Sequence, residues 1–399
     1  MDVTSAVQGH GKGTVGHAQN GARLTFDVGH GLFSTASVDV GTRLLLRALA
    51  KDGWVGRSGR ILDVGCGYGP IGVTLGALNP EATVTMADRD LLAVEFAASN
   101  ARRNGVEPER CLASLGFDAL EPDDRFDLIA SNVPAKVGPD AIRSLVLDGA
   151  RHLTPEGVMA VVVIDRIAEE VERLVEEHAE VLIRRDSRGY LFLAYRPAPG
   201  AGVAGPAFDR GVYDRRTGDF EIGGRSFGAA TVWGLPEFDT PGWSTALAGE
   251  QLLRARGDRI VVVNPGQGLL PALLASTRPR ASIDVRGRDL LALRTSARNA
   301  AGLAAVETKL TLDHEIADDV DVAIYQIPEQ EPTPLTVAAV RSLRGRPSVI
   351  VHGSANQLGR AAQALRQTTG ERVKHRGAAS LWFGSASARG RPRRASRFR

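Results

Sequence analysis

A glycine-rich loop with two carboxylates is the clearest candidate for chemistry in this chain of 399 residues. The loop runs Asp63-Val-Gly-Cys-Gly-Tyr-Gly69, and Asp88 ends the next apolar run, 25 residues after Asp63. Glycines can adopt positive φ and let a ligand approach the backbone closely. The start of the following helix offers free N–H groups, and a carboxylate at the end of a second strand suits a ribose diol.

The position of Asp63 distinguishes between two nucleoside cofactors. A carboxylate inside the loop repels the pyrophosphate of NAD but attracts the ammonium group of a methionine. The pattern therefore favours S-adenosylmethionine (SAM). We assign to the SAM site the residues of this loop and of the second strand end: Asp63, Gly65, Cys66, Gly67, Gly69, Asp88 and Arg89.

Alternating strand and helix patterns position these residues. Apolar strand-like runs at 61–64, 83–87, 126–131 and 157–164 alternate with helical patterns at 71–78, 91–103 and 141–153. Such alternation predicts an α/β fold, a Rossmann-like parallel sheet covered by helices on both faces. Strand patterns at 181–184 and 190–195 flank a turn and predict a terminal antiparallel hairpin.

The second half of the chain repeats the first. Residues 259–268 overlay residues 60–69 with an offset of 199, and this register holds at 288–292 and at Asn299, which overlays Asn100. After a shorter loop, residues 320–328 overlay 126–134. Three separated blocks in register favour duplication of one domain over chance similarity.

The second copy lacks the residues to which we assign chemistry. Val262, Asn264, Pro265, Gly287 and Gln326 stand where the first copy has Asp63, Gly65, Cys66, Asp88 and Asn132. Without either carboxylate, we expect no SAM binding in the second copy. We expect the second copy either to brace the first copy or to widen the substrate surface.

Three blocks of the first half carry a resemblance to a known family. They are Gly31-Leu-Phe-Ser34 with Asp39-Val-Gly41 and Leu44-Leu-Leu46, the glycine loop, and Ser131-Asn-Val-Pro134. Over residues 21–196 the chain resembles the class I SAM-dependent methyltransferases of the "methyltransferase small" family, among them ribosomal RNA guanine-N2 methyltransferases. The resemblance implies tandem Rossmann-like domains, here with the second one degenerate.

The third block implies the catalytic residues Asn132, Val133 and Pro134. In the family, the Asn side-chain oxygen and the next carbonyl accept hydrogen bonds from an amino group and hold its lone pair toward the methyl group. Asn132 is also counted among the cofactor-binding residues. Here Val133 replaces a proline, and Ala135 replaces an aromatic residue that would stack on a base. A plain loop in which Asn132 caps the next helix is the alternative.

The remaining cofactor-binding assignments lie in two other segments. Phe33, Ser34 and Asp39 are expected to shape the floor of the SAM pocket, with helix capping as the alternative role. Asp118 lies where many SAM enzymes contact the adenine, and an exposed turn aspartate is the alternative.

These features predict five segments. Residues 1–20 form a flexible N-terminal arm, 21–196 the SAM-binding methyltransferase domain, and 197–209 a Pro/Gly-rich linker. Residues 210–385 form the degenerate domain, and 386–399 an Arg-rich disordered tail.

Composition limits compartment and partners. The chain has two cysteines, no signal-peptide pattern and no long apolar run, which predicts a cytoplasmic protein without a disulfide framework or a membrane span. The histidines show no metal-ligand spacing, so we predict no metal site. Of 49 basic residues, 44 are arginines. Genome composition explains much of this excess, but the basic tail and the tandem surface could also bind RNA phosphates.

Three functions remain open at this point. The first is methylation of an exocyclic amine, guanine N2 of ribosomal RNA, which the tail and the tandem surface support. The second is N-methylation of a small molecule or a protein amide, which fits Ala135. The third is an RNA-binding protein that retains SAM without transferring its methyl group.

Overall fold

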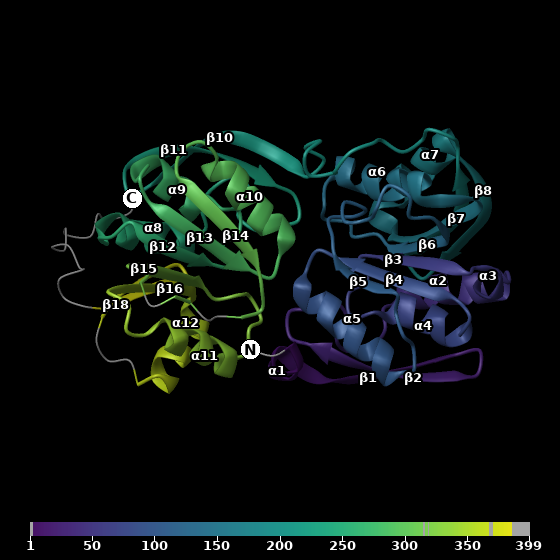
Figure 1. Ribbon diagram of the computed structural model, residues 1–399, viewed down its shortest axis with the longest axis horizontal. Helices are drawn as coiled ribbons and strands as arrows, with labels where there is room; N and C mark the ends of the chain where they lie inside the picture. The colour runs from purple at the N-terminus through teal and green to yellow at the C-terminus, as the bar shows by residue number, and fades with distance from the viewer. Residues whose placement is uncertain (1–2, 314–315, 318, 367–369, 385–399) are drawn as a thin grey trace. The chain divides into compact units, whose positions relative to one another are not determined.

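The computed structural model describes residues 3–313, 316–317, 319–366 and 370–384. It divides into two compact units whose chain boundary lies between Asp214 and Arg215 (Figure 1). We describe each unit separately.

The N-terminal unit is built on a seven-stranded sheet with the strand order β5-β4-β3-β6-β7-β9-β8. The first five of these strands are parallel, and β9 and β8 are antiparallel. The fold class predicted from the alternating pattern is therefore confirmed, including the terminal hairpin. In sheet order the bounds are Arg110–Ala113, Thr83–Asp88, Arg60–Val64, Phe126–Asn132, Leu153–Ile164, Tyr190–Pro197 and Ala179–Ser187.

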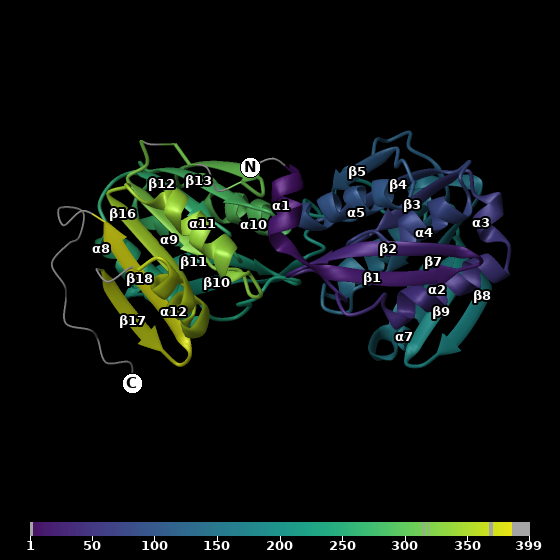
Figure 2. The same ribbon diagram turned by 90° about the horizontal axis from the view of Figure 1, so that it is seen from below.

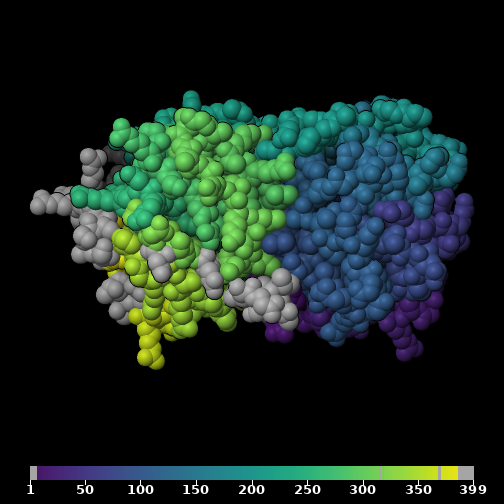
Figure 3. Space-filling view, in the orientation of Figure 1, coloured from purple at the N-terminus to yellow at the C-terminus, as the bar shows by residue number. Residues whose placement is uncertain are grey.

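Helices cover both faces of this sheet (Figure 1). On one side lie α2 (Val40–Lys51), α4 (Pro70–Leu78) and α5 (Leu91–Arg103), and the short α3 (Trp54–Arg57) follows α2. On the other side lie α6 (Pro139–Leu147) and α7 (Asp165–His178), with the 3-10 turn η1 (Asp148–His152). Most of the face of this unit seen in Figure 3 is blue, the colour of the chain around α5.

The prediction of a flexible arm over residues 1–20 is wrong for the described part of that segment. Val3–His10 forms α1, and Gly11–Gln19 forms β1, which pairs antiparallel with β2 (Ala22–Gly29); Figure 2 shows this hairpin. The inward side chains of β1 are Val15, His17 and Gln19, of which two are polar. The strand therefore lacks the apolar alternation that marks a half-buried strand in sequence.

The C-terminal unit repeats the same topology. Its sheet has the order β14-β13-β12-β15-β16-β18-β17, which matches the first sheet strand for strand, and a β10–β11 hairpin precedes it as β1–β2 does in the first unit. The duplication predicted from the sequence is confirmed at this level. In sheet order the bounds are Ala305–Leu310, Ser282–Gly287, Arg259–Val263, Val322–Gln326, Ser348–Ser354, Ala378–Gly384 and Glu371–His375, and the hairpin strands are Asp214–Ile222 and Arg225–Val232.

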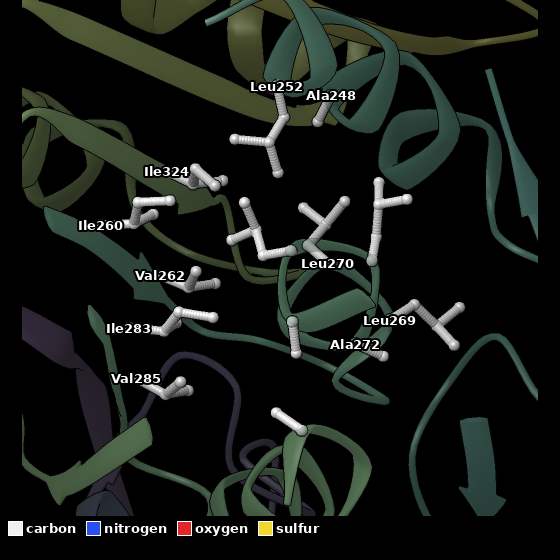
Figure 4. Close-up of a cluster of buried hydrophobic side chains, with 14 of the residues drawn as sticks. Ala248, Leu252, Ile260, Val262, Leu269, Leu270, Ala272, Ile283, Val285 and Ile324 are labelled. Atoms are coloured by element: carbon white, nitrogen blue, oxygen red, sulfur yellow. The ribbon is translucent and has the colours of Figure 1, made fainter. Parts of the chain in front are cut away.

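The helices of the C-terminal unit are α8 to α12, with the bounds Trp243–Arg254, Leu269–Thr277, Leu290–Ala300, Thr333–Leu343 and Ala355–Ala364. Apolar side chains of α8, α9 and α10 pack on one face of the sheet, and Figure 4 shows Leu252, Ile260, Val262 and Leu270 within this core. Val262 is 1% exposed, so an aliphatic core residue stands where the first copy has Asp63.

The segment predicted as a linker, residues 197–209, lies against the N-terminal unit. The backbone N–H of Val203 donates to Asp148 Oδ1 over 2.9 Å, and the N–H of Ala207 donates to Asp118 Oδ1 over 2.6 Å. The Pro/Gly composition therefore marks a segment with fixed contacts on its own unit. The predicted Arg-rich tail, 386–399, lies outside the described residues.

Candidate functional site

The predicted site residues gather at the carboxyl edge of the N-terminal sheet. β3, β4 and β6 are parallel neighbours, so the glycine loop after β3, Asp88 at the end of β4 and Asn132 at the end of β6 lie on one edge. This is the edge at which open α/β sheets bind ligands. A strand ladder thus brings together residues that are up to 69 positions apart in sequence.

The glycine loop adopts the conformation that its composition requires. Gly65, Gly67 and Gly69 have φ values of 73°, 56° and 90°, a region that L side chains rarely occupy. A Cβ atom on Gly65 or Gly67 would meet no atom within 4 Å, whereas one on Gly69 would lie 3.1 Å from the Cα of Ala97. The last glycine therefore lets the loop pack on α5, and the first two leave open space beside the backbone.

Asp63 is fully buried and only partly hydrogen bonded. Its Oδ2 accepts from the N–H of Gly72 over 2.8 Å, while its Oδ1 has no hydrogen-bond partner in the part of the chain that the structure describes. Burial, against an opposing hydrogen bond from the Gly72 N–H and with a smaller contribution from the charge of Asp88, raises the pKa of this carboxyl to about 7. A buried acceptor without a donor is costly, and an incoming hydrogen-bond donor would satisfy it.

Asp88 is fixed to the same loop. Its Oδ2 accepts from the N–H of Gly67 and its Oδ1 from the N–H of Asp90, each over 2.9 Å. Each carboxylate oxygen can accept a second hydrogen bond, so the oriented carboxylate can also serve a ribose diol. Arg89, the next residue, is half-buried.

Asn132 has a defined amide orientation. Its Nδ2 donates to Asp39 Oδ2 over 3.0 Å and to Thr42 Oγ1 over 3.1 Å. A carboxylate only accepts hydrogen bonds, so the NH₂ group must face Asp39 and the Oδ1 atom must point away from it. The following N–H, that of Val133, donates to the carbonyl of Val162 over 3.0 Å and extends the β6–β7 ladder.

Asp39 combines both roles that the sequence left open. It is the N-cap of α2, where its side chain accepts from the N–H groups of Gly41 and Thr42. The same carboxylate holds the Asn132 amide and accepts from the Tyr190 hydroxyl over 3.1 Å. Burial and the charge of Asp39 raise the pKa of the Tyr190 phenol, which therefore stays protonated as a donor.

Thr42 and Tyr190 are site residues that our sequence reasoning missed. The Asp39-x-x-Thr42 spacing at a helix start could have pointed to Thr42, since both residues lie in the first turn of α2. Tyr190 lies 151 residues from Asp39, and nothing in the sequence indicates their contact. Asn132 itself is 93 residues from Asp39.

The entry loop between β2 and α2 carries two further predicted residues. Ser34 has a φ of 55°; its Oγ donates to the carbonyl of Ser37, and its own carbonyl accepts from the Tyr68 hydroxyl of the glycine loop. Phe33 is 71% exposed, the largest exposure of any large apolar side chain in the described residues. The structure thus joins Ser34 to the loop, and contact of either residue with a cofactor stays a prediction.

Asp118 and Cys66 complete the predicted set. The Asp118 carboxylate accepts from the N–H groups of Ala207 and Phe208, so it anchors the segment after β9, and its contact with adenine stays a prediction. Cys66 is buried within the loop, and burial raises the pKa of its thiol far above the usual range. The thiol therefore stays protonated and serves packing.

The corresponding loop of the second copy keeps its backbone and loses its chemistry. Asn264, Gly266 and Gly268 have φ values of 58°, 57° and 72°, close to those of the first loop. A Cβ on Gly266 would lie 3.3 Å from Gln326 Oε1, so the counterpart of Asn132 fills space that is open in the first copy. Gly287 stands where the first copy has Asp88.

In the described residues, no group of three or more His, Cys, Asp and Glu side chains is arranged to hold a metal ion. Among the same residues, no helix could span a membrane.

Comparison with known proteins agrees with the site. Residues 23–192 match the model of the methyltransferase small domain. The chain is 32% identical over 172 residues to the uncharacterized protein YbxB of Bacillus subtilis (strain 168), which is 43% of this chain and 84% of that protein. The chain belongs to the methyltransferase small family. The predicted resemblance is confirmed, and the N-terminal unit is a SAM-dependent methyltransferase domain.

The chain is also similar to two proteins that are described as ribosomal RNA methyltransferases. The chain is 36% identical over 143 residues to ribosomal RNA small subunit methyltransferase C of Salmonella choleraesuis (strain SC-B67), which is 35% of this chain and only 40% of that relative. The structure of the T. thermophilus 16S rRNA N2 G1207 methyltransferase, in complex with AdoMet and guanosine, covers 95% of this chain with a TM-score of 0.64 at 15% identity. This last similarity shows the tandem fold.

Proposed function

We propose that this protein transfers the methyl group of SAM to an exocyclic amine, and that the amine is N2 of a guanine in ribosomal RNA. The observation that carries the proposal is the fixed amide of Asn132. Because Asp39 and Thr42 hold its NH₂ group, its Oδ1 remains the atom that can accept from an amine.

The residues of the glycine loop fit SAM. Asp63 Oδ1 is a buried acceptor without a donor among the described residues, which suits the methionine ammonium. The open space at Gly65 and Gly67 admits a ligand beside the backbone, and Asp88 suits the ribose hydroxyls. When bound, SAM supplies an electrophilic methyl group on a sulfonium.

The residues at the end of β6 orient the acceptor. Asn132 Oδ1 and the carbonyl of Val133 accept hydrogen bonds from the two amine hydrogens, which directs the nitrogen lone pair away from them and toward the methyl group. Pro134 limits the flexibility of the loop that follows. Positive charge that develops on the nitrogen is stabilised by the same two oxygens. Asp39 acts through Asn132 and is a positioning residue.

A nucleic-acid acceptor is supported by the relatives and by the exposed ring of Phe33. Relatives of this family are named as ribosomal RNA methyltransferases, and the T. thermophilus structure holds guanosine. The family's stacking aromatic is replaced by Ala135, but Phe33 exposes 71% of its surface in the entry loop six residues before Asp39. Phe33 thus offers an aromatic face near the site. We further propose that the protein acts in the cytoplasm and binds RNA through its basic tail and the tandem-domain surface.

Ala135 also favours a second candidate, N-methylation of a small molecule or a protein amide. The residue is half-buried, its side chain is short, and a non-planar acceptor would fit beside it. A third candidate, a SAM-retaining RNA-binding protein without transfer, predicts SAM binding that no acceptor consumes.

One experiment separates these functions. The protein is incubated with radiolabelled SAM and, in turn, ribosomal subunits, free ribosomal RNA and RNase-treated cell extract. Label at guanine N2 in RNA, lost in Asn132→Ala with SAM affinity retained, supports the proposal. Label only in metabolites or protein overturns it in favour of the second candidate. SAM binding without transfer, unchanged by Asn132→Ala, leaves the third.

A further inference from the structure

The C-terminal unit preserves the backbone around the position of the first copy's amine site. Ser34 and its counterpart Glu237 have φ values of 55° and 67°, and both lie in the loop before the first long helix of their unit. The hairpin turn beside that helix also matches, with φ values of 51° and 84° at Arg188 and Gly189 and of 44° and 80° at Arg376 and Gly377. The backbone conformation of this loop and of this hairpin turn is therefore retained.

The side chains on this surface have changed. Gly242 is the N-cap of α8, where the first copy has Asp39, and Ala378 begins β18, where the first copy has Tyr190. The phenol is absent, and the carboxylate beside the Gly242 N-cap is now that of Glu237, which accepts from Thr245 Oγ1 over 2.9 Å. Trp243 begins α8, and His375 and Arg376 lie at the end of β17 and in the following turn.

An aromatic ring stands at the centre of this surface. Trp243 is 37% exposed, and its ring centroid lies 4.3 Å from that of His375 at an interplanar angle of 59°. The guanidinium carbon of Arg376 lies 5.2 Å from the centre of the same indole. The ring is thus held by its neighbours and still presents apolar surface to solvent, the arrangement that stacks on a nucleobase at low entropic cost.

Positive charge lines the strand beside the ring. β17 is the edge strand of the sheet (Figure 2), and Arg372, Lys374 and Arg376 alternate along it and its turn, all exposed. Alternate residues share one side of a strand and lie about 7 Å apart. Among the residues that the structure describes, none of the three forms an ion pair. The one acid of β17, Glu371, pairs with Arg254 instead.

The equivalent strand of the first copy, β8, has no arginine or lysine without an ion pair. On β8, Arg184 pairs with Glu172 and Asp186, and Arg185 pairs with Asp52. Its arginines are therefore neutralised by neighbouring acids. In the turn after β8, Arg188 is exposed and forms no ion pair among the described residues, so the first copy has one such cation where the second copy has three.

We propose that the C-terminal unit binds single-stranded RNA on this surface, which consists of Trp243, Arg372, Lys374, His375 and Arg376 and which we call the Trp243 surface. The three cations neutralise phosphates, and the indole stacks on a base. This inference rests on the proposed function, because it assigns a part of the RNA contact to the degenerate copy. An acidic protein segment would satisfy the cations but would gain nothing from the exposed indole.

The test measures binding of a fluorescein-labelled, 12-nucleotide mixed-sequence RNA to the full chain by fluorescence anisotropy, without SAM. We expect Trp243→Ala to weaken binding about tenfold or more, because a lost base stack has that effect, and Trp243→Phe to restore most of it. Lys374→Gln should lower the slope of log Kd against log salt concentration by about 0.7. Arg376→Asn, which tolerates the positive φ, should do the same.

Arg225→Gln is the matched control. Arg225 is an exposed cation at the start of β11. The preceding turn lies beside Leu253 at the opposite end of α8, so loss of Arg225 should leave RNA affinity within about twofold. The inference would be overturned if Trp243→Ala bound the RNA as tightly as wild type does. It would also be overturned if polyglutamate displaced the labelled RNA as strongly as unlabelled RNA does.

The two proposals fail in different ways. Labelled guanine N2 in ribosomal RNA together with unchanged RNA affinity of Trp243→Ala would refute the Trp243 surface and leave the proposed activity standing. The opposite result is RNA affinity that depends on Trp243 together with methyl transfer only to a small molecule. It would refute the proposed acceptor and leave the Trp243 surface standing.

Discussion

The Asp39 carboxylate serves two elements at once, because it caps α2 and holds the Asn132 amide. These roles can be separated with Asp39→Ser, since serine also caps helices but is too short to reach Asn132. We expect kcat to fall about 100-fold through loss of amide orientation. The SAM Kd should stay within about twofold, as measured by calorimetry, and the melting temperature should shift by only a few degrees.

Thr42→Val is the companion variant for Asp39→Ser. It removes the second acceptor of Asn132 Nδ2 and leaves the first in place. A smaller loss, roughly tenfold in kcat, is expected because one of two hydrogen bonds survives. Full activity in Asp39→Ser would show that Asn132 is held by other means.

The buried carboxyl of Asp63 predicts that SAM binding depends on pH. Its pKa is raised by burial to about 7, so lowering the pH through 7 protonates it and removes the charge that pairs with the ammonium. SAM affinity should fall by up to about tenfold per pH unit below 7 and level off above it. Calorimetry at pH 6, 7 and 8 measures this dependence. In Asp63→Asn the affinity should be weak and flat over the same range; a wild-type profile that is equally flat would argue against this ammonium site.

At the scale of elements, each unit ties its hairpin to its loop through one asparagine. Asn100 of α5 accepts from the N–H of Asp27 and donates to the carbonyls of Asp27 and Tyr68. Asn299 of α10 makes the same bonds to Ala230 and Gln267. The sequence showed this pair only as a repeat marker, whereas the structure shows that it clamps β2 or β11 to the loop.

Asn100→Ala and Asn299→Ala therefore form a matched pair. Each removes three hydrogen bonds to backbone groups, one buried and two partly buried, and should destabilise its own unit by about 2–4 kcal/mol. Only Asn100→Ala should also weaken SAM binding, because only its loop carries Asp63 and is closed by Asp88. Urea titration and calorimetry report the two effects. Equal SAM affinities in both variants would mean that the clamp does not shape the loop.

Prediction from sequence succeeded where residues close together in the sequence carry the pattern. The strand Ile61 to Val64, the glycine loop and Asp88 follow one another along a short stretch, so periodicity and spacing predicted a strand, a loop and a carboxylate at the end of the next strand, as the structure has them. The support of Asn132 could not be predicted in the same way, because Asp39 and Tyr190 come from elements far away in sequence. β1 was missed because it buries His17 and Gln19 in place of apolar residues.

At the scale of the whole molecule, duplication kept a fold and divided its roles. Both sheets have the same strand order, and both loops have left-handed backbone at the same three positions. We therefore expect that a backbone of this kind is insufficient for SAM binding and that the carboxylates Asp63 and Asp88 decide it. Val262 and Gly287 show the alternative, in which the position becomes aliphatic core or loses its side chain.

This division predicts one SAM per chain and a selective effect on stability. Calorimetric titration should give a stoichiometry of one, Asp88→Ala should abolish binding, and Asn264→Ala should leave it intact. SAM at 100 times its Kd stabilises the unit that binds it by about 2.7 kcal/mol. For a unit of this size that corresponds to a rise of about 5–10 °C in its melting temperature. In a thermal scan, only the transition of the N-terminal unit should move, and Asp88→Ala should cancel the shift. Two SAM per chain, or a shift that persists in Asp88→Ala, would place a competent site in the second copy.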